Sequence, residues 1–346
     1  MKNDRRHTLL VASHGLDAIT RDMLSRAERQ SGGELRVLVA GPGEAIEAPE
    51  IRSKADIRAA RAYRGIMKRE GVDTTFSPST SGLATMLWAS MGLGIRNIGY
   101  RGTQAKVRRS DPTNLLGLLN PRVSHIVCET ADIAESLGAK VGRGKVSVAT
   151  KPFDLAWVEE AMSAPLHVKE AEGCFSMSYV GVSKGRPHKG LRTLLEAIRL
   201  LEGEKLHLTV VGDADEADIE FAKGLPVSFI ATTPDAVRYL PESDLYILSS
   251  LRDASPRTLR EAQACGVPCI VSDIPGAREL ISPGETGLLV PAGDAVALAD
   301  AIRMLHSDEL LRKEMARACR PFIARRFDTD EYARYFLNLF SDKQIL

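Results

Sequence analysis

Short apolar runs alternate with amphipathic stretches along the first half of the chain. The runs are rich in Val, Ile and Leu, and the stretches between them carry apolar residues at helical spacing. Near-continuous apolar strands separated by helices predict a parallel sheet that is covered on both faces. The predicted strands are residues 8–12, 35–40, 95–100, 125–128 and 146–149, and the predicted helices are 19–30, 55–70 and 81–91.

The same alternation restarts after a charged stretch, residues 155–173, that contains no predicted strand. We therefore expect an N-terminal Rossmann-like domain over 1–160, a second one over 161–328, and a C-terminal helix at 329–346 that packs back on the first. Two doubly wound α/β domains in tandem predict a ligand cleft between them, at the carboxyl ends of the strands. The second set of strands is 177–180, 206–211, 227–230, 245–248, 268–272 and 287–290, with helices at 190–201, 217–223, 258–265, 295–306, 309–326 and 329–340.

Composition narrows the class of protein without identifying it. The 346 residues are 44% hydrophobic and 26% charged, which is typical of a globular chain with two domains. A net charge of +1 argues against nucleic-acid binding through a general basic field. The five cysteines lack zinc-ligand spacing, and no apolar run reaches the ~18 residues that cross a bilayer. These features favour a cytoplasmic protein with reduced thiols.

The segment 243–281 carries the clearest chemistry. A buried strand leads into a polar loop with Asp253, and a helix that contains Glu261 begins near Arg257, just after Pro256. A helix N-terminus attracts phosphate through its free backbone N–H groups, and here Thr258 belongs to the first turn. Carboxylates accept paired hydrogen bonds from vicinal hydroxyls, so Asp253 and Glu261 suit a bound sugar nucleotide.

This segment resembles the signature of family 4 glycosyltransferases, which have the GT-B fold. Their pattern is two acids separated by seven residues, followed by Glu-Ala-Met-Ala-x-Gly-x-Pro; this chain has Asp253, then Glu261 opening the run EAQACGVP. The first acid is Asp where the family has Glu, so its reach is one methylene shorter. The resemblance covers residues 179–326 well and the N-terminal half loosely.

The resemblance implies specific roles. Glu261 would bind the donor's ribose hydroxyls, Asp253 would lie near the donor sugar, and the backbone of Ser255, Pro256, Arg257 and Thr258 would contact the donor. The alternative interpretation is a plain helix entry with a solvated acid.

A second motif, YVGVSKGRPHKG at 179–190, places a basic glycine-containing loop between a strand and a helix. Cations there would stabilise the charge that grows on a leaving diphosphate. The family has Arg, four residues, then Lys-Gly; Lys189 matches the lysine, Lys184 has the spacing of the arginine, and Arg186 forks better onto phosphate. The alternative is a solvated basic turn.

Gly181 and Gly212 follow predicted strands and are expected beside the nucleotide. Asp213 and Asp215 form an Asp-x-Asp pair, which in other glycosyltransferases ligates a metal. Their position after a buried parallel strand favours a structural turn or a base contact, so we expect no metal cofactor.

The N-terminal half departs from the family. Ser13, His14 and Gly15 follow the first strand and are expected on the acceptor side; an exposed turn is the alternative for His14. Residues 71–82 resemble the family's strand and loop but lack both of its histidines, and Arg101 stands where many members have His-Gly. Arg101 is expected to face the reaction centre, with a surface salt bridge as the alternative.

Two further segments bear on the acceptor. The sequence KPFD at 151–154 replaces Asn-Gly-Val-Asp before the second domain, and the basic cluster 106–109 could hold an anionic or phosphorylated lipid at the inner membrane face. A solvated loop is the alternative for this cluster.

The resemblance implies a glycosyltransferase that retains the anomeric configuration of the donor sugar. It would move sugar from a UDP-, GDP- or ADP-sugar to a glycan or lipid-linked acceptor, in cell-surface polysaccharide or lipopolysaccharide synthesis. Lys189, Asp253, Arg186 and Lys184 would serve catalysis. Two rival functions share the fold: a nucleotide-sugar epimerase that needs no acceptor, and a non-catalytic scaffold that binds nucleotide or a partner.

Overall fold

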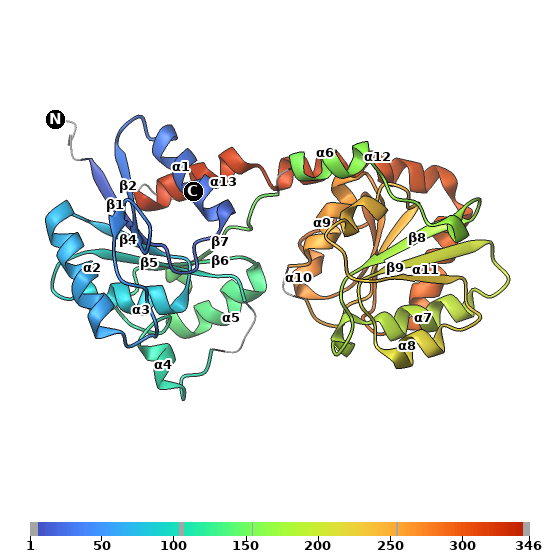
Figure 1. Cartoon of the computed structure of the whole chain (residues 1–346), viewed down its shortest axis with the longest axis horizontal. Coiled ribbons are helices and arrows are strands. Elements are labelled where there is room, and N and C mark those ends of the chain that lie inside the picture. Colours follow the sequence, from blue (N-terminus) through green and yellow to red (C-terminus); the bar gives the residue numbers. More distant parts are fainter. Residues whose placement is uncertain (1–5, 104–106, 154, 254, 342–346) are drawn as a thin grey trace. The chain divides into compact units, whose positions relative to one another are not determined.

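The structure is a computed structural model that describes residues 6–103, 107–153, 155–253 and 255–341. The chain forms two compact units. The first combines Met1–Pro152 with Asp328–Leu346, and the second is Phe153–Phe327. Each unit is an α/β structure around one parallel sheet (Figure 1).

The first unit holds a seven-stranded sheet in the order β3-β2-β1-β4-β5-β6-β7, in which all neighbours pair parallel. Helices α1 and α13 cover one face, and α2, α3 and α5 cover the other. The strands are β1 His7–Ala12, β2 Leu35–Gly41, β3 Ile46–Glu47, β4 Thr74–Ser77, β5 Arg96–Arg101, β6 His125–Cys128 and β7 Val146–Val148; the helices are α1 Ala18–Gln30, α2 Ile57–Glu70, α3 Thr80–Ala89, α4 Pro112–Leu115, α5 Ala131–Val141 and α13 Thr329–Phe340.

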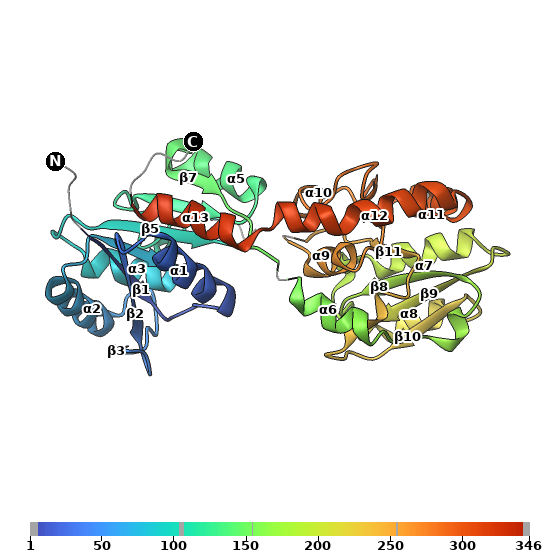
Figure 2. The same cartoon turned by 90° about the horizontal axis from the view of Figure 1, so that it is seen from above.

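Helix α13 completes the core of the first unit, although it comes from the end of the chain. It lies beside α1 in both views (Figures 1 and 2). Phe336 and Phe340 are fully buried, and both rings pack against Phe76 of β4 at centroid distances of 5.4 and 5.5 Å. Aromatic side chains bury the most apolar area, so α13 contributes a large share of this core.

The second unit holds a six-stranded parallel sheet in the order β10-β9-β8-β11-β12-β13. Helices α7 and α11 cover one face, and α6, α9 and α10 cover the other. The strands are β8 Phe175–Val180, β9 Leu206–Val211, β10 Val227–Ile230, β11 Leu245–Leu248, β12 Cys269–Ser272 and β13 Gly287–Val290; the helices are α6 Ala156–Ser163, α7 Leu191–Leu200, α8 Glu216–Phe221, α9 Arg257–Ala264, α10 Pro275–Arg278, α11 Ala295–Ser307 and α12 Glu309–Arg326.

The boundary between the units differs from the expected one. The structure divides the chain after Pro152, eight residues before the predicted end of the first domain at 160. The reason is α6, whose Val158 and Ala161 are buried in the core of the second unit. Within the described residues, no helix combines the length and the apolar character needed to cross a membrane.

Candidate functional site

The basic loop after β8 and the loop after β11 meet at an ion pair. Lys189 Nζ lies 2.6 Å from Asp253 Oδ2, and the two side chains are 25% and 15% exposed. The backbone joins the same loops, because the Leu251 N–H donates to the His188 carbonyl at 2.8 Å. Asp253 Oδ1 also accepts from the Ser255 N–H at 3.3 Å. Lys189 is therefore held in one place, which lowers the ordering cost of binding an anion there.

Two glycines allow the loops of this site to approach each other. A Cβ on Gly190, whose φ is +72°, would lie 1.8 Å from the Ser249 carbonyl oxygen. A Cβ on Gly212, whose φ is +129°, would lie 2.5 Å from the Gly181 carbonyl oxygen. Both positions therefore require glycine. Gly181 and Gly212, expected at the donor, form the crossing of the loops after β8 and β9.

Glu261 lies in the second turn of α9 and is only 6% exposed. Its Oε1 is 2.7 Å from Arg257 Nε, and the Trp157 side chain also donates to the carboxylate. Burial raises the pKa of Glu261, and the Arg257 and Trp157 contacts partly oppose that rise. A buried carboxylate with few donors is a strong acceptor for hydroxyl groups.

The start of α9 presents backbone donors. The helix begins at Arg257, and no side chain of the described residues caps it. The Thr258 hydroxyl bonds to the buried Tyr246 hydroxyl at 2.6 Å, so Thr258 offers a ligand its backbone N–H. The Ser255 hydroxyl is buried and has no hydrogen-bond partner within the described ranges. Free N–H groups at a helix start and an unsatisfied hydroxyl suit a phosphorylated sugar.

The other two predicted cations lie apart from the Lys189–Asp253 pair. Lys184 and Arg186 are exposed and line an open hollow together with Asp215 and Asp218. Neither forms an ion pair with any residue that the structure describes. The structure thus joins Lys189 to Asp253 but does not bring Lys184 or Arg186 into that pair.

Asp213 and Asp215 use their carboxylates in loop structure. Asp213 Oδ1 accepts from the Thr232 N–H at 3.0 Å, and the Asp213 N–H donates to Thr232 Oγ1 at 3.1 Å. The bond from the Thr232 N–H lowers the pKa of Asp213. Asp215 accepts from the Gly185 N–H at 3.0 Å. Backbone amides thus already engage one or both oxygens of each carboxylate.

The loop after β1 is packed against its neighbours at both ends. Ser13 sits against Gly41, where an added Cβ would lie 1.8 Å from the Ser13 hydroxyl. Gly15 has φ +79°, and a Cβ there would lie 2.8 Å from Ser79 Cβ, at the start of α3. His14, between them, is half-buried. The loop is therefore held close to its neighbours on both sides of His14.

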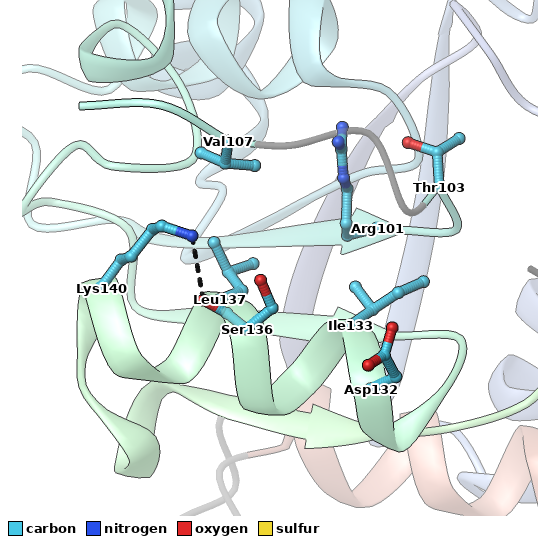
Figure 3. Close-up of a pocket in the computed structure, with 8 residues that line it drawn as sticks. All are labelled: Arg101, Thr103, Val107, Asp132, Ile133, Ser136, Leu137 and Lys140. Atoms are coloured by element: carbon cyan, nitrogen blue, oxygen red, sulfur yellow. Dashed lines mark hydrogen bonds between the residues drawn. The ribbon is translucent and has the colours of Figure 1, made fainter. Parts of the chain in front are cut away.

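Arg101 ends β5 and lines a small cavity against α5 (Figure 3). The cavity has a volume of about 40 Å³, enough for water but not for a sugar ring. Burial lowers the pKa of the Arg101 guanidinium. Besides Arg101, the lining consists of Thr103, Val107, Asp132, Ile133, Ser136, Leu137 and Lys140.

Two predictions fall partly outside the described residues. Lys106 of the basic cluster and Asp154 of the KPFD segment lie there. The rest of the cluster, Arg108 and Arg109, is exposed, and Arg109 Nη2 donates to the Lys140 carbonyl at 3.1 Å.

Sequence reasoning missed two groups of side chains. Trp157, which contacts Glu261, lies in the charged stretch 155–173, for which the sequence predicts no strand and no site residue. In the first unit, the Tyr100 hydroxyl donates to Glu129, and Lys151 pairs with Asp17 while its Nζ lies 5.2 Å from the Tyr100 ring centroid. Burial raises the pKa of Tyr100. No motif joins these positions in the sequence.

Comparison with known proteins agrees with this architecture. The family Glycosyl transferases group 1 matches residues 175–308, which are most of the second unit. A solved glycosyltransferase from Rickettsia africae has a TM-score of 0.76 at 17% identity and covers 98% of both chains. Anabaena Alr3699/HepE, solved in complex with UDP, has a TM-score of 0.73 at 16% identity and covers 97% of this chain and all of its own. The two units thus have the GT-B fold.

Curated relatives match only part of the chain. A Campylobacter jejuni N,N'-diacetylbacillosaminyl-diphospho-undecaprenol alpha-1,3-N-acetylgalactosaminyltransferase is 31% identical over 44% of this chain and 41% of its own. The Rhizobium meliloti lipopolysaccharide core biosynthesis glycosyltransferase LpsE is 29% identical over 70% of this chain and 72% of its own. The match spans less than half of the first two relatives. Residues 175–308 match the group 1 glycosyltransferase family, so the resemblance expected from the motifs is confirmed over this region.

Proposed function

We propose that the chain is a retaining glycosyltransferase that uses a nucleotide sugar. The observation that supports this most is the Lys189–Asp253 pair beside the uncapped start of α9, within the region that matches the family. A fixed cation and free backbone N–H groups are what a sugar diphosphate needs.

The proposed chemistry assigns one task to each group. Glu261 accepts hydrogen bonds from the ribose hydroxyls, and the α9 N–H groups bind the diphosphate. As the bond between sugar and phosphate breaks, negative charge grows on the leaving oxygen, and Lys189 stabilises it. Asp253 keeps Lys189 oriented and lies near the sugar. Lys184 and Arg186, which are exposed, add attraction for the incoming anion.

The acceptor belongs to the first unit in this proposal. His14 and Arg101 are the polar side chains that we assign to it, and the acceptor is a glycan or a lipid-linked sugar. Relatives named for lipopolysaccharide core and capsular polysaccharide synthesis support a setting in surface polysaccharide assembly. Arg108 and Arg109 would bring the first unit to an anionic membrane surface on the cytoplasmic side.

The test is a binding screen followed by a transfer assay. UDP-, GDP- and ADP-sugars are titrated by calorimetry, and the donor that binds is offered to glycan and lipid-linked acceptors. We expect one base to bind and the product to keep the donor's anomeric configuration by NMR. Conversion of the donor without any acceptor would indicate the epimerase, and tight binding without transfer or hydrolysis would indicate the scaffold.

A further inference from the structure

The carboxylate of Glu261 is already occupied in the free protein. Arg257 Nε lies 2.7 Å from Oε1, and the Trp157 side chain donates to the same group. The Glu261 side chain is 7% exposed, whereas that of Arg257 is 61% exposed. The guanidinium therefore covers a buried carboxylate from the solvent side.

Arg257 is poorly placed if it serves only to stabilise α9. It is the first residue of the helix, where a positive side chain opposes the helix dipole, and the first turn contains no acidic residue to offset it. The order Arg then Glu at i,i+4 is also the weaker orientation for a helical ion pair. These two facts suggest that Arg257 has another task.

The Arg257 guanidinium also stacks on an exposed aromatic ring. Its central carbon is 4.9 Å from the centroid of Trp157, a side chain of α6 that is 45% exposed. The stacking gives the guanidinium a fixed resting place over Glu261. Both contacts lie on the solvent side, so a ligand can displace the arginine without unfolding the helix.

We infer that Arg257 is a cap on the ribose-binding carboxylate. It satisfies Glu261 while no nucleotide is bound, and the ribose hydroxyls must displace it. The proposal rests on the ribose role that the proposed function gives Glu261. Arg257 therefore reduces the affinity that the ribose hydroxyls add. The net gain in binding free energy is the difference between the contacts of Glu261 with the ribose and its contact with Arg257.

The decisive experiment compares ribose with deoxyribose. The nucleoside diphosphate that binds, from UDP, GDP and ADP, is titrated alongside its 2′-deoxy form, and the ratio of the two dissociation constants is recorded. Because both ligands carry the same phosphates, the ratio cancels any attraction between Arg257 and phosphate. In Arg257→Gln we expect the preference for ribose to rise by about threefold or more. In Glu261→Gln the preference should fall close to one.

A matched control separates the cap from general charge effects. Arg317→Gln removes an exposed arginine of α12 in the same unit and should leave the ratio unchanged. An unchanged ratio in Arg257→Gln would overturn the cap, and a ribose preference that survives Glu261→Gln would overturn the role on which it rests. Failure of all three nucleotides to bind would overturn the proposed function together with the cap.

Fluorescence gives a second, independent readout. The chain has two tryptophans, so Trp88→Phe leaves Trp157 as the only one. Nucleotide binding should then change Trp157 emission as the guanidinium leaves the ring, and Arg257→Gln should at least halve that change. Tight nucleotide binding with silent Trp157 emission would overturn the cap while leaving the proposed function intact.

Discussion

The two units share one architecture but differ in how their predicted site residues are used. In the second unit, Lys189 from one loop and Asp253 from another are joined directly, and Glu261 is buried on α9, the helix that follows Asp253. In the first unit, His14 follows β1 whereas Arg101 ends β5, so the two side chains come from separate strands of the sheet. A nucleotide diphosphate poses one recurring chemical problem, whereas acceptors vary. The proposed donor side can therefore be recognised from motifs, and the proposed acceptor side cannot.

Removal of Lys189 tests the proposed donor site most directly. Lys189→Ala should lower kcat by ~10²-fold or more, because a fixed cation stabilises the leaving diphosphate mainly in the transition state. Steady-state kinetics with the true donor and acceptor would measure this. Lys205→Ala, an exposed lysine of the same unit, is the control and should turn over normally. Unchanged kcat in Lys189→Ala would reduce the basic loop to a solvated turn.

Glu261 should show opposite effects on binding and on stability. Glu261→Gln should weaken donor binding by roughly tenfold or more, because a hydrogen bond to a charged group contributes ~1.5–3 kcal/mol. Burial raises the pKa of Glu261 in the folded protein, so the ionised carboxylate destabilises the fold. The contribution of Glu261 to the free energy of unfolding is therefore fully present below the unfolded pKa, and it is lost as pH rises through the folded pKa.

We therefore expect Glu261→Gln to melt at or above the parent temperature at pH 7. The difference should shrink as pH falls towards the carboxyl pKa, where the parent also becomes neutral. Calorimetric titration and melting curves across pH would measure both effects. A variant that binds the donor as well as the parent would remove Glu261 from the ribose role.

Arg101 tests the other half of the comparison. Arg101→Ala should raise the acceptor KM by about three- to tenfold, the loss of one polar contact, and leave donor affinity unchanged. Kinetics with varied acceptor, together with donor calorimetry, would separate the two. A change in donor affinity alone would move Arg101 out of the acceptor side.

The smallest expected effect concerns metal. Asp213 and Asp215 already accept hydrogen bonds from backbone N–H groups, so we expect transfer activity to survive excess EDTA. Activity lost in EDTA and restored by Mn²⁺ or Mg²⁺ would show that this pair binds a cation after all.

The fold was predictable because buried parallel strands are apolar at nearly every position. Strands β6, β9, β10, β11 and β13 coincide with their predicted ranges. Strand β4, with the sequence TTFS, does not stand out by hydropathy because two of its four residues are threonines. Thr75 is nevertheless buried, and its hydroxyl donates a hydrogen bond to the Asn97 side chain. The structure places the boundary before α6, whereas the sequence predicts it within that helix, at residue 160. Only two residues of α6, Val158 and Ala161, are buried in the core of the second unit, and this gives a weak signal in the sequence.

The candidate site was predictable residue by residue but not as a set of contacts. Motif spacing indicates Lys189 and Asp253 separately, yet they lie 64 positions apart, and only the sheet order places β8 next to β11. Trp157 could not be assigned for the same reason, since it reaches Glu261 from a helix before the second sheet begins.

Because α13 comes from the end of the chain, the first unit begins synthesis first but is completed last. A ribosome makes the second unit, Phe153–Phe327, before it makes the residues that bury Phe76 of the first. The first unit therefore lacks part of its core while the second unit is being made. Its exposed apolar surface could cause aggregation during translation. A premature stop near Asp328 would leave the donor-side motifs intact in a chain whose first unit cannot complete its core.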